Sequence, residues 1–393
     1  MFELLPDRPT VRAEPAGAGA AETARGRLLI VNVRGFKRAD ALYRELRALG
    51  WDTTVVDVDE PALLRWYARA RAFRPSLARW RQRVERVAGR LARTAFAFRY
   101  RSRRYGRLIE QSGAKYDLIL QGGGMFAPAW PLPTTRYAIF CDCTVKLGEG
   151  EILSGVDFAS AASAAKWYAL EASLYRHAGR VFSASEWVRD SLLRDYGVEP
   201  GRAVTVGEGS SLRAPDSALT RHDSRTILYV GYEFQRKGGE VLLAAFEKVA
   251  AEIPDAELVI AGPPRVARPL PPRVRLLGRL EPAELSRLYA RASLFVMPSL
   301  FEPFGQVFLE AMEHALPCVG SDRGAIPEII VDGRTGLIAP AGDPRALAER
   351  IIYLLHRPDT MRLMGERGRA RVRERFTWPA VARRIDAGLL ELL

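Results

Sequence analysis

The chain has few cysteines and few histidines, so the usual protein ligands of zinc are scarce. Its 393 residues include three cysteines, Cys141, Cys143 and Cys318, and four histidines. Cys141 and Cys143 form a single C-x-C, and the second pair that would complete a zinc site is absent. A disulfide between them would be strained. We therefore predict three reduced structural cysteines and no metal site, a usage typical of the cytoplasm.

The chain also lacks a long apolar run. No stretch approaches the roughly 20 residues that a membrane-spanning helix needs. The first 25 residues are rich in alanine, glycine, proline and glutamate, and they lack the basic start and apolar core of an export signal. Their composition predicts a disordered leader over residues 1–25. Together these absences predict a cytoplasmic protein.

Positive charge is in excess, and it is concentrated in one segment. Residues 65–107 contain fifteen arginines and one acidic residue, Glu85, whereas the formal charge of the whole chain is +13. Between Leu77 and Phe98 apolar residues recur at spacings of three and four, which predicts one amphipathic helix with its arginines off the apolar stripe.

Three interpretations of this basic segment are open. It is a helical insertion that packs its apolar stripe and leaves its arginines in solvent, or a basic surface for anionic lipid or an anionic acceptor. The third and weakest interpretation is a nucleic-acid surface. No nucleic-acid reader motif accompanies the charge, so we expect no nucleic-acid partner.

Short β-like runs alternate with helical runs along the chain, which is typical of parallel α/β domains. The length suits two such domains. We expect an N-terminal Rossmann-like domain over residues 26–215, which includes the basic segment 65–107. A polar, aperiodic linker follows at 216–224, and a second Rossmann-like domain spans 225–376. We predict that residues 377–393 form a C-terminal helix that packs back on the N-terminal domain.

The densest group of chemically informative residues lies between positions 298 and 340. A short strand ends before Pro298, and helical spacing begins after Gly305, where a ligand can approach the backbone and the first helix amides. Glu302 and Glu310 are eight residues apart. In a continuous helix this separation is about 12 Å, too long for the carboxylate pair of a glycosidase. We therefore expect them to bind separate parts of one elongated ligand, through its sugar and ribose hydroxyls.

A second group, VGYEFQRKGG, spans residues 230–239. A strand ends at Gly231, a short loop carries Arg236 and Lys237, and Gly238-Gly239 opens a helix. Cationic side chains beside a helix N-terminus form a diphosphate site without needing a metal. A basic loop before a helix is by itself common on protein surfaces, and the combination with residues 298–340 favours a ligand site.

These residues resemble the retaining glycosyltransferases of family 4. EPFGQVFLE has the E-x7-E spacing of that family, and RKGG is similar to its phosphate-binding K-G turn. VRLLGRLEPAELSRLYARASLFVMPS and GAIPEIIVDGRTGLIAP resemble the stretches on either side. The resemblance covers about residues 225–375; in the N-terminal half it rests on strand order and on SEWVRDSLLRDYGV at 185–198. It implies the GT-B fold, an α/β architecture in which two Rossmann-like parallel-sheet domains face each other across a cleft.

The resemblance implies a role for each of three charged residues. Glu302 would lie near the transferred sugar, Glu310 would bind the ribose, and Lys237 would neutralise the diphosphate leaving group. The family precedent is a front-face displacement in which the leaving phosphate helps to deprotonate the acceptor. The protein then supplies electrostatic support and no strong base.

Loop and backbone positions would complete the donor site. The loop at Gly278-Arg279 would meet the base, and the amides at Phe304-Gly305 would contact sugar and phosphate. The donor-binding candidates are Gly35, Gly231, Arg236, Gly278, Arg279, Phe304, Gly305 and Glu310.

The chain departs from the family pattern at three places. The usual Gly-Arg after the first strand of the second domain is Gly231-Tyr232 here, which leaves Arg236 as the candidate substitute for a missing phosphate cation. The usual histidine at the end of an N-terminal strand is absent, and Asp142 is the nearest polar candidate for a catalytic role on the acceptor side. The early Gly-Gly turn is reduced to Arg34-Gly35.

The resemblance implies a retaining enzyme that moves a hexose from a UDP- or GDP-linked sugar to a hydroxyl acceptor, with no metal and no cofactor. The acceptor would be a glycan or a lipid-linked sugar, in cell-envelope glycan, glycolipid or exopolysaccharide synthesis. Through residues 65–107 the protein would also meet an anionic membrane surface, at the inner membrane face.

Alternatives are a sucrose- or trehalose-type transferase, a sugar-nucleotide epimerase of the same fold, and a catalytically silent scaffold that works through its basic surface. The E-x7-E spacing points away from the epimerase, and the retention of Glu302, Glu310 and Lys237 argues against the scaffold.

Overall fold

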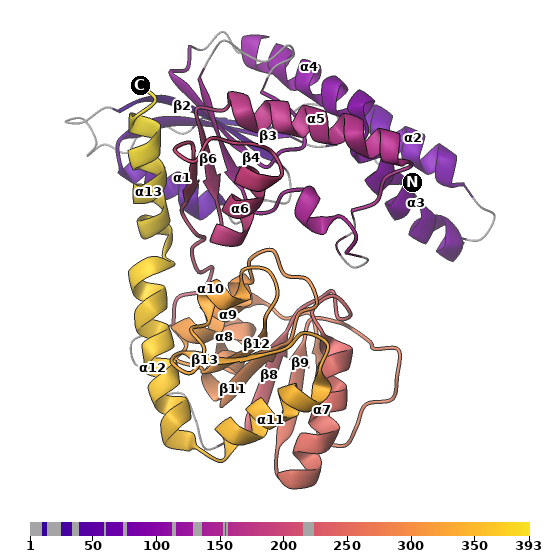
Figure 1. Ribbon diagram of the computed structural model, residues 1–393, viewed down its shortest axis with the longest axis vertical. Coiled ribbons are helices and arrows are strands. Elements are labelled where there is room, and N and C mark those ends of the chain that lie inside the picture. Colours follow the sequence, from indigo (N-terminus) through magenta and orange to yellow (C-terminus); the bar gives the residue numbers. More distant parts are fainter. Residues whose placement is uncertain are drawn as a thin grey trace. The chain divides into compact units, whose positions relative to one another are not determined.

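The computed structural model describes residues 10–13, 25–33, 39–58, 60–73, 77–111, 115–128, 136–151, 154, 156–214 and 224–393. The chain divides into two compact units (Figure 1). The first unit comprises the described residues of Met1–Val206 together with Ala382–Leu393, and the second comprises those of Gly207–Val381. Each unit contains one sheet. The prediction of two Rossmann-like α/β domains is therefore confirmed.

The first sheet consists of six parallel strands and one antiparallel edge strand. In order across the sheet they are β1 (Thr10–Ala13), β3 (Trp51–Val58), β2 (Gly26–Val33), β4 (Leu118–Gly122), β5 (Tyr137–Cys141), β6 (Arg180–Ser183) and β7 (Ala203–Thr205). Every residue of β4 and β5 is buried. Strands of this kind are covered by other elements on both faces of the sheet. Their sequences are therefore almost continuously apolar and do not alternate between apolar and polar residues.

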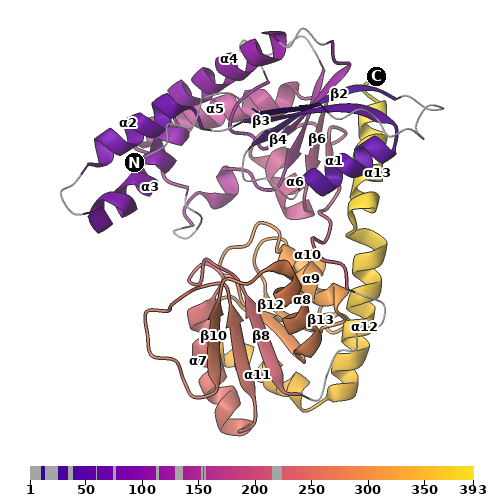
Figure 2. The same ribbon diagram turned by 180° about the vertical axis from the view of Figure 1, so that it is seen from behind.

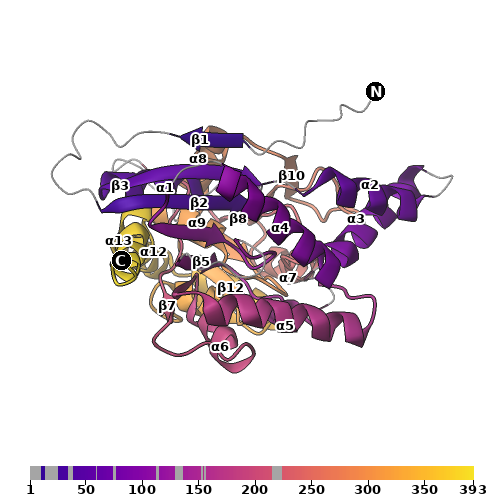
Figure 3. The ribbon, with the colours of Figure 1, turned by 90° about the horizontal axis from the view of Figure 1, so that it is seen from above.

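Strand β1 lies inside the predicted disordered leader, so that prediction is wrong for Thr10–Ala13. Thr10 pairs with Asp57 and Ala13 with Thr54, antiparallel to β3, and Figure 3 shows β1 beside β3 at the edge of the sheet. The edge of β3 offers unpaired backbone groups, and the β-branched start of TVRA favours an extended strand there. The rest of the leader, except Arg25, lies outside the described residues.

Helices cover the first sheet and extend beyond it. They are α1 (Ala39–Ala48), α2 (Ala62–Ala72), α3 (Leu77–Ala92), α4 (Ala95–Gln111), α5 (Ala161–His177) and α6 (Glu186–Arg194), with a 3₁₀ turn at Lys146–Gly148. Helices α4 and α5 run side by side, where Phe98 meets Trp167 edge to face with ring centroids 5.6 Å apart. Figures 1 and 2 show α2 and α3 at one end of this pair, away from the sheet.

The single helix predicted between Leu77 and Phe98 is two helices. Helix α3 ends at Ala92 and α4 begins at Ala95. Between them the Thr94 hydroxyl accepts a hydrogen bond from the Ala97 amide at 3.1 Å, as an N-cap does. The apolar spacing continues through the break, which is why periodicity alone does not detect it.

The second sheet is entirely parallel. In order across the sheet its strands are β10 (Val274–Gly278), β9 (Glu257–Ala261), β8 (Thr226–Val230), β11 (Leu294–Met297), β12 (Cys318–Ser321) and β13 (Gly336–Ala339), and Figure 2 shows β10 at one edge. The chain goes from β8 outward to β10 and then returns to the other side of β8 at β11. The strand order therefore reverses between β8 and β11, and ligands of open α/β sheets bind at the carboxyl ends of such strands.

The helices of the second unit are α7 (Gly239–Glu252), α8 (Pro282–Arg291), α9 (Gln306–Glu313), α10 (Ile326–Ile329), α11 (Pro344–Leu355) and α12 (Pro358–Arg375). Helix α13 (Trp378–Leu390) follows, and its residues from Ala382 onward belong to the first unit. Pro358 and Pro379 stand at the starts of α12 and α13, where a helix has no need of the missing amide hydrogen. Among the described residues, no helix is both long and apolar enough to cross a bilayer. All three cysteines are free, as predicted.

The C-terminal segment is fixed to the first unit by a buried polar contact. The indole of Trp51, which is fully buried, donates to the Asp386 carboxylate at 2.8 Å, and Arg25 pairs with the same carboxylate. Removal of a buried acceptor leaves its donor without a partner, which costs about 2 kcal/mol. We therefore expect Asp386→Ala to lower the free energy of unfolding by about that amount in urea denaturation.

Glu391→Ala is the matched control, because Glu391 is mostly exposed in its ion pair with Arg180. A change of no more than about 0.5 kcal/mol is expected there. Equal losses in the two variants would contradict the structural role given to Asp386.

Candidate functional site

Two loops of the second unit meet at the carboxyl ends of β8 and β11. The loop from Gly231 to Gly238 leads into α7, and the loop from Pro298 to Gly305 leads into α9. The Leu300 amide donates to the Arg236 carbonyl at 2.8 Å and so joins the loops directly. The N-termini of two helices and the predicted cations thus lie at the reversal point of the sheet.

Glu302 is the centre of a buried ion cluster at this point. It is only 6% exposed, and its Oε2 accepts from the Lys237 ammonium at 2.9 Å and from the Ser299 hydroxyl at 3.2 Å. The Arg236 guanidinium lies 3.6 Å from the same oxygen. The other carboxylate oxygen, Oε1, has no hydrogen-bond partner among the residues that the structure describes.

Arg236 is held in place from two further directions. It donates to the Phe301 carbonyl at 2.7 Å and, through Nε, to the Glu233 carboxylate at 3.0 Å. Two cations, Arg236 and Lys237, thus share the buried carboxylate of Glu302, while the second carboxylate, that of Glu233, is 64% exposed. Because the charge of an exposed carboxylate is screened by solvent, the buried part of the cluster stays positive, which suits an anionic ligand.

One glycine makes the close approach of these loops possible, and a second lets the chain turn into α9. Gly238 has φ 72°, in the left-handed region, and a Cβ there would lie 1.9 Å from the Pro298 carbonyl oxygen. Gly305 has φ 102° and precedes the first residue of α9. Residues with a Cβ are strained at such φ values, which explains why both motifs have glycine at these positions.

Glu310 lies one helical turn inside α9 and has a different environment. It is 8% exposed and accepts from the Tyr289 hydroxyl of α8 at 3.1 Å. Burial raises the pKa of Tyr289 well above its usual value, so this hydroxyl stays protonated and remains a donor. Glu302 is thus held by cations, whereas Glu310 is held by a neutral hydroxyl. This difference favours separate roles for the two carboxylates.

The predicted base loop lies next to the position that departs from the family pattern. The Gly278 carbonyl accepts from the Gly262 amide at 2.7 Å. The Arg279 guanidinium lies over the ring of Tyr232, 5.9 Å from its centroid, and Tyr232 is 59% exposed. The tyrosine that replaces the expected arginine therefore forms an exposed cation–π pair with Arg279, a surface on which a flat base can stack.

Sequence reasoning missed Glu208, which supports the start of α9. The Gln306 side chain donates to the Glu208 carboxylate and accepts from the Ser211 hydroxyl at 3.1 Å. Phe304 is buried beside them, with its ring 6.2 Å from that of Phe376. The sequence pattern places Glu208 in the predicted N-terminal domain, and only its contacts identify it as part of the second unit.

The predicted site residues fall into three groups. All donor candidates from Gly231 to Glu310, together with Lys237 and Glu302, belong to the second unit. Asp142 belongs to the first unit, directly after β5, and is half-buried. Gly35 lies outside the described residues. Among the described residues, no three histidine, cysteine or acidic side chains are grouped to hold a metal ion.

Glu171 is a second residue that the sequence did not single out. It lies on α5, is 1% exposed, and accepts from the hydroxyls of Tyr196 at 2.7 Å and Tyr175 at 3.2 Å and from the Trp167 indole at 3.1 Å. Burial is the largest cause of the rise in its pKa, to about 7. The four-residue spacing of Glu171 from Trp167 and from Tyr175 was a signal of this cluster, but it is common in helices.

The Glu171 cluster supports the loop that carries Asp142. The Val145 amide donates to Glu171 at 3.4 Å, and the Lys146 amide donates to the Tyr196 hydroxyl at 3.0 Å. A buried carboxyl group thus fixes the backbone that follows the predicted acceptor-side residue.

The chain matches two family models. The model described as "Glycosyl transferase 4-like domain" matches residues 37–209, and the model described as "Glycosyl transferases group 1" matches residues 224–357. The second range contains all the donor candidates of the second unit, and the first contains Asp142 and the basic segment.

Curated relatives match about half of the chain. It is 31% identical over 247 residues to the alpha-maltose-1-phosphate synthase of Mycolicibacterium smegmatis, which is 54% of this chain and 63% of the relative. It is 33% identical over 210 residues to the phosphatidyl-myo-inositol mannosyltransferase of Mycobacterium leprae, which is 51% of this chain and 55% of the relative. The chain therefore spans between half and two thirds of the length of these relatives.

Solved structures share the fold over nearly the whole chain. Sucrose-phosphate synthase from Thermosynechococcus elongatus has a TM-score of 0.67 at 20% identity, covering 93% of this chain and 98% of that one. Anabaena HepE, solved in complex with UDP and glucose, has a TM-score of 0.62 at 15% identity, covering 92% and 98%. The predicted GT-B fold is confirmed.

The raised pKa of Glu171 predicts a pH dependence of stability. Its folded pKa of about 7 lies above the ordinary value of 4.5, so its contribution is fully present below pH 4.5 and is lost as the pH rises through 7. At about 1.4 kcal/mol per pKa unit, the loss is about 3 kcal/mol. The side chain of Glu171→Gln cannot ionise. When the pH is raised from about 5 to about 8, we therefore expect the free energy of unfolding of this variant to rise by that amount relative to the parent chain.

Urea denaturation of both chains at the two pH values measures this difference. Glu151→Gln, on the exposed surface of the same loop region, is the control and should follow the parent chain. Parallel pH dependences for Glu171→Gln and the parent would contradict a buried, titrating Glu171.

Proposed function

This chain belongs to the group 1 glycosyltransferases of the GT-B fold, and from this we propose that it transfers a hexose from a nucleotide-diphosphate sugar to a hydroxyl acceptor, with retention of the anomeric configuration. The observation that carries the proposal is the buried cluster of Glu302, Lys237 and Arg236 beside two helix N-termini. The nucleotide is UDP or GDP, and UDP is also the nucleotide bound to the Anabaena relative of the same fold.

The diphosphate would bind where the positive charge is concentrated. Lys237 lies two residues before α7, and the first amides of α9 have no acceptors within their own helix. In the proposed reaction the bond between the anomeric carbon and the diphosphate oxygen breaks, and the acceptor oxygen bonds to the same face of that carbon. The acceptor proton passes to the leaving phosphate. Lys237 and Arg236 stabilise the negative charge that develops on the diphosphate.

Glu302 has two tasks in this proposal. Its Oε2 holds the cations that receive the diphosphate, so they need not be reorganised when the sugar bond breaks. Its Oε1, which has no hydrogen-bond partner among the described residues, can accept from a sugar hydroxyl. Its negative charge favours the positive charge that develops on the sugar ring. Glu310 would accept from the ribose, and the Tyr232–Arg279 pair would stack on the base.

We propose that the acceptor is a glycan or a lipid-linked sugar at an anionic membrane surface on the cytoplasmic side. Large apolar side chains are exposed beside arginines on α2, among them Leu63 and Trp66, and Phe73 follows the helix at 66% exposed. Exposed aromatic and basic residues together are typical of proteins that lie on a membrane. This surface supports a role in cell-envelope glycan, glycolipid or exopolysaccharide synthesis, with Asp142 on the acceptor side.

The first experiment is a thermal unfolding series with UDP- and GDP-linked sugars and no added metal. A ligand that binds only the folded protein raises the unfolding midpoint, so a donor is expected to give a selective shift. Absence of a shift with every nucleotide sugar would contradict the proposal and favour a catalytically silent scaffold.

With the donor identified, Lys237→Ala and Glu310→Gln should separate catalysis from binding. Loss of one group that stabilises developing charge costs roughly a hundredfold or more in kcat, so Lys237→Ala should lower transfer by that factor. Glu310→Gln keeps an acceptor for Tyr289 and should mainly weaken nucleotide binding, by about tenfold. Rates of product formation and titration calorimetry measure the two effects.

Lys248→Ala is the control, because Lys248 lies on the exposed face of α7. It should leave both quantities unchanged. Small and equal effects of Lys237→Ala and Glu310→Gln would count against the roles proposed for them.

A further inference from the structure

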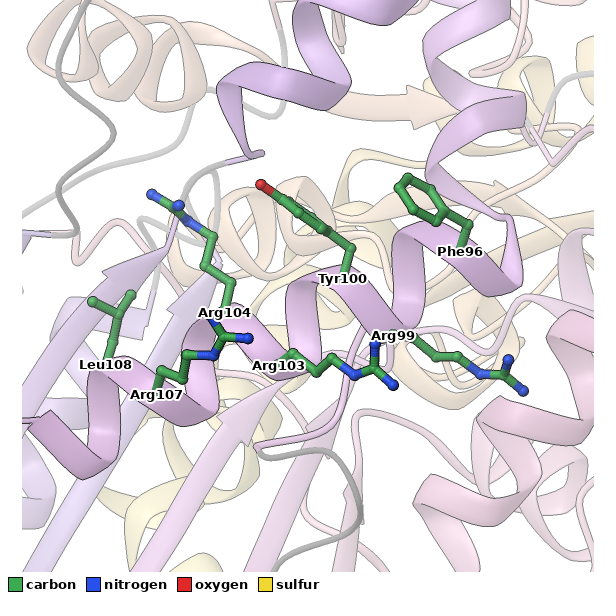
Figure 4. Close-up of a pocket in the computed structure, with 7 residues that line it drawn as sticks. All are labelled: Phe96, Arg99, Tyr100, Arg103, Arg104, Arg107 and Leu108. Carbon is green, nitrogen blue, oxygen red and sulfur yellow. The ribbon is translucent and has the colours of Figure 1, made fainter.

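A cavity of about 620 Å³ lies along α4, within the basic segment. All the described residues that line it belong to this helix, and Figure 4 shows them as four arginines, two aromatic residues and a leucine. We call it the α4 cavity. Its volume is that of a small-molecule site, and its lining combines positive charge with flat apolar surface.

Three of the arginines form a row. Arg99, Arg103 and Arg107 are four residues apart, so they share one side of the helix at steps of about 6 Å. All three are exposed. Like charges at this spacing repel one another and destabilise a helix. Arg103 and Arg107 form no hydrogen bond or ion pair with any described residue, so no direct ion pair within the described chain offsets that repulsion.

Other arginines of the basic segment have structural partners. Arg101 is 2% exposed and binds both oxygens of Glu60, at 2.8 and 3.0 Å, as well as the Ala92 carbonyl. Arg90 pairs with Asp157 at 2.6 Å. The segment therefore uses acids from outside it to neutralise its structural arginines. No such explanation applies to Arg103 and Arg107.

Two aromatic rings lie beside the row. Phe96 and Tyr100 are stacked with centroids 5.9 Å apart and an interplanar angle of 25°. Phe96 is 60% exposed although it is large and apolar. Figure 4 shows the two rings next to each other on the helix, adjacent to the arginines. A ligand that covered them would bury apolar area while it neutralised the row.

We propose that the α4 cavity binds a phosphate ester, with its anionic groups on Arg103 and Arg107 and its carbon skeleton against Phe96 and Tyr100. The planar guanidinium binds phosphate oxygens in pairs, which an ammonium does not, and the row contains only arginines. Two neighbouring cations match the double charge of a phosphate group. The ester is carried either by a free phosphorylated sugar or by the headgroup of a membrane lipid. The site does not depend on the transfer chemistry of the second unit.

The test uses the full chain with two probes. Fructose bisphosphate is titrated by calorimetry, and vesicles of phosphatidylcholine with or without phosphatidylinositol phosphate are used for co-sedimentation. We expect binding of one or both phosphate probes, and a loss of about a hundredfold in the Arg103→Ala/Arg107→Ala double variant, or about tenfold for each arginine. Phe96→Ala should weaken binding by a smaller factor.

Arg287→Ala/Arg291→Ala is the matched control, since both arginines are exposed on α8 outside the basic segment, they are four residues apart like Arg103 and Arg107, and the change in charge is the same. It should retain binding within about twofold, because charge outside the cavity is largely screened by salt. Circular dichroism and the unfolding midpoint should be unchanged in both double variants, because the side chains are exposed.

The probes identify the source of the ester. Binding of fructose bisphosphate that is lost only in the Arg103/Arg107 variant supports a free phosphorylated ligand, and binding confined to the phosphoinositide vesicles with the same loss supports a lipid headgroup. Equal weakening in the Arg287/Arg291 control, or no binding of either probe, would overturn the proposal. Nucleotide-sugar binding, measured on the same preparations, tests the proposed glycosyl transfer separately.

Discussion

The candidate donor site depends on one buried carboxylate that holds two cations. Burial of three charged groups is stabilising only when they are paired and hydrogen-bonded, and Glu302 meets that condition through Lys237, Arg236 and a serine hydroxyl. The pairing requires the loops after β8 and β11 to touch, which a glycine at 238 permits. The ion cluster therefore forms only because the strand order places these two loops side by side and Gly238 lets them touch.

The arginines of the first unit lie in two different environments. Arg101 is buried and neutralised by Glu60, so it serves the fold. Arg103 and Arg107, on the same helix, are exposed and have no such partner among the described residues. The net charge of the sequence does not distinguish these cases; burial does. The same principle applies to Glu171, whose elevated pKa follows from its position inside the fold and not from its neighbours in sequence.

Much of the fold could be predicted from the sequence, because short apolar runs and helical spacing report local structure. The two α/β units, and the strands that end near Gly231 and before Pro298, follow from these patterns. Strand β1 was missed because its pairing with β3 is a long-range contact, and the end of α3 was missed because Thr94 interrupts no periodicity. For the site, the motifs predicted which residues matter, but the partners of Glu302 and the support from Glu208 depend on tertiary contacts.

The most direct test of the central claim is Glu302→Gln, assayed for both nucleoside-diphosphate binding and sugar transfer. The glutamine still accepts a hydrogen bond from Lys237 but no longer neutralises it, so the cluster becomes more positive. The account predicts that binding of the nucleoside diphosphate is retained or strengthened while transfer falls roughly a hundredfold. Undiminished transfer, or a loss of diphosphate binding in a folded variant, would contradict the claim that Glu302 organises this site.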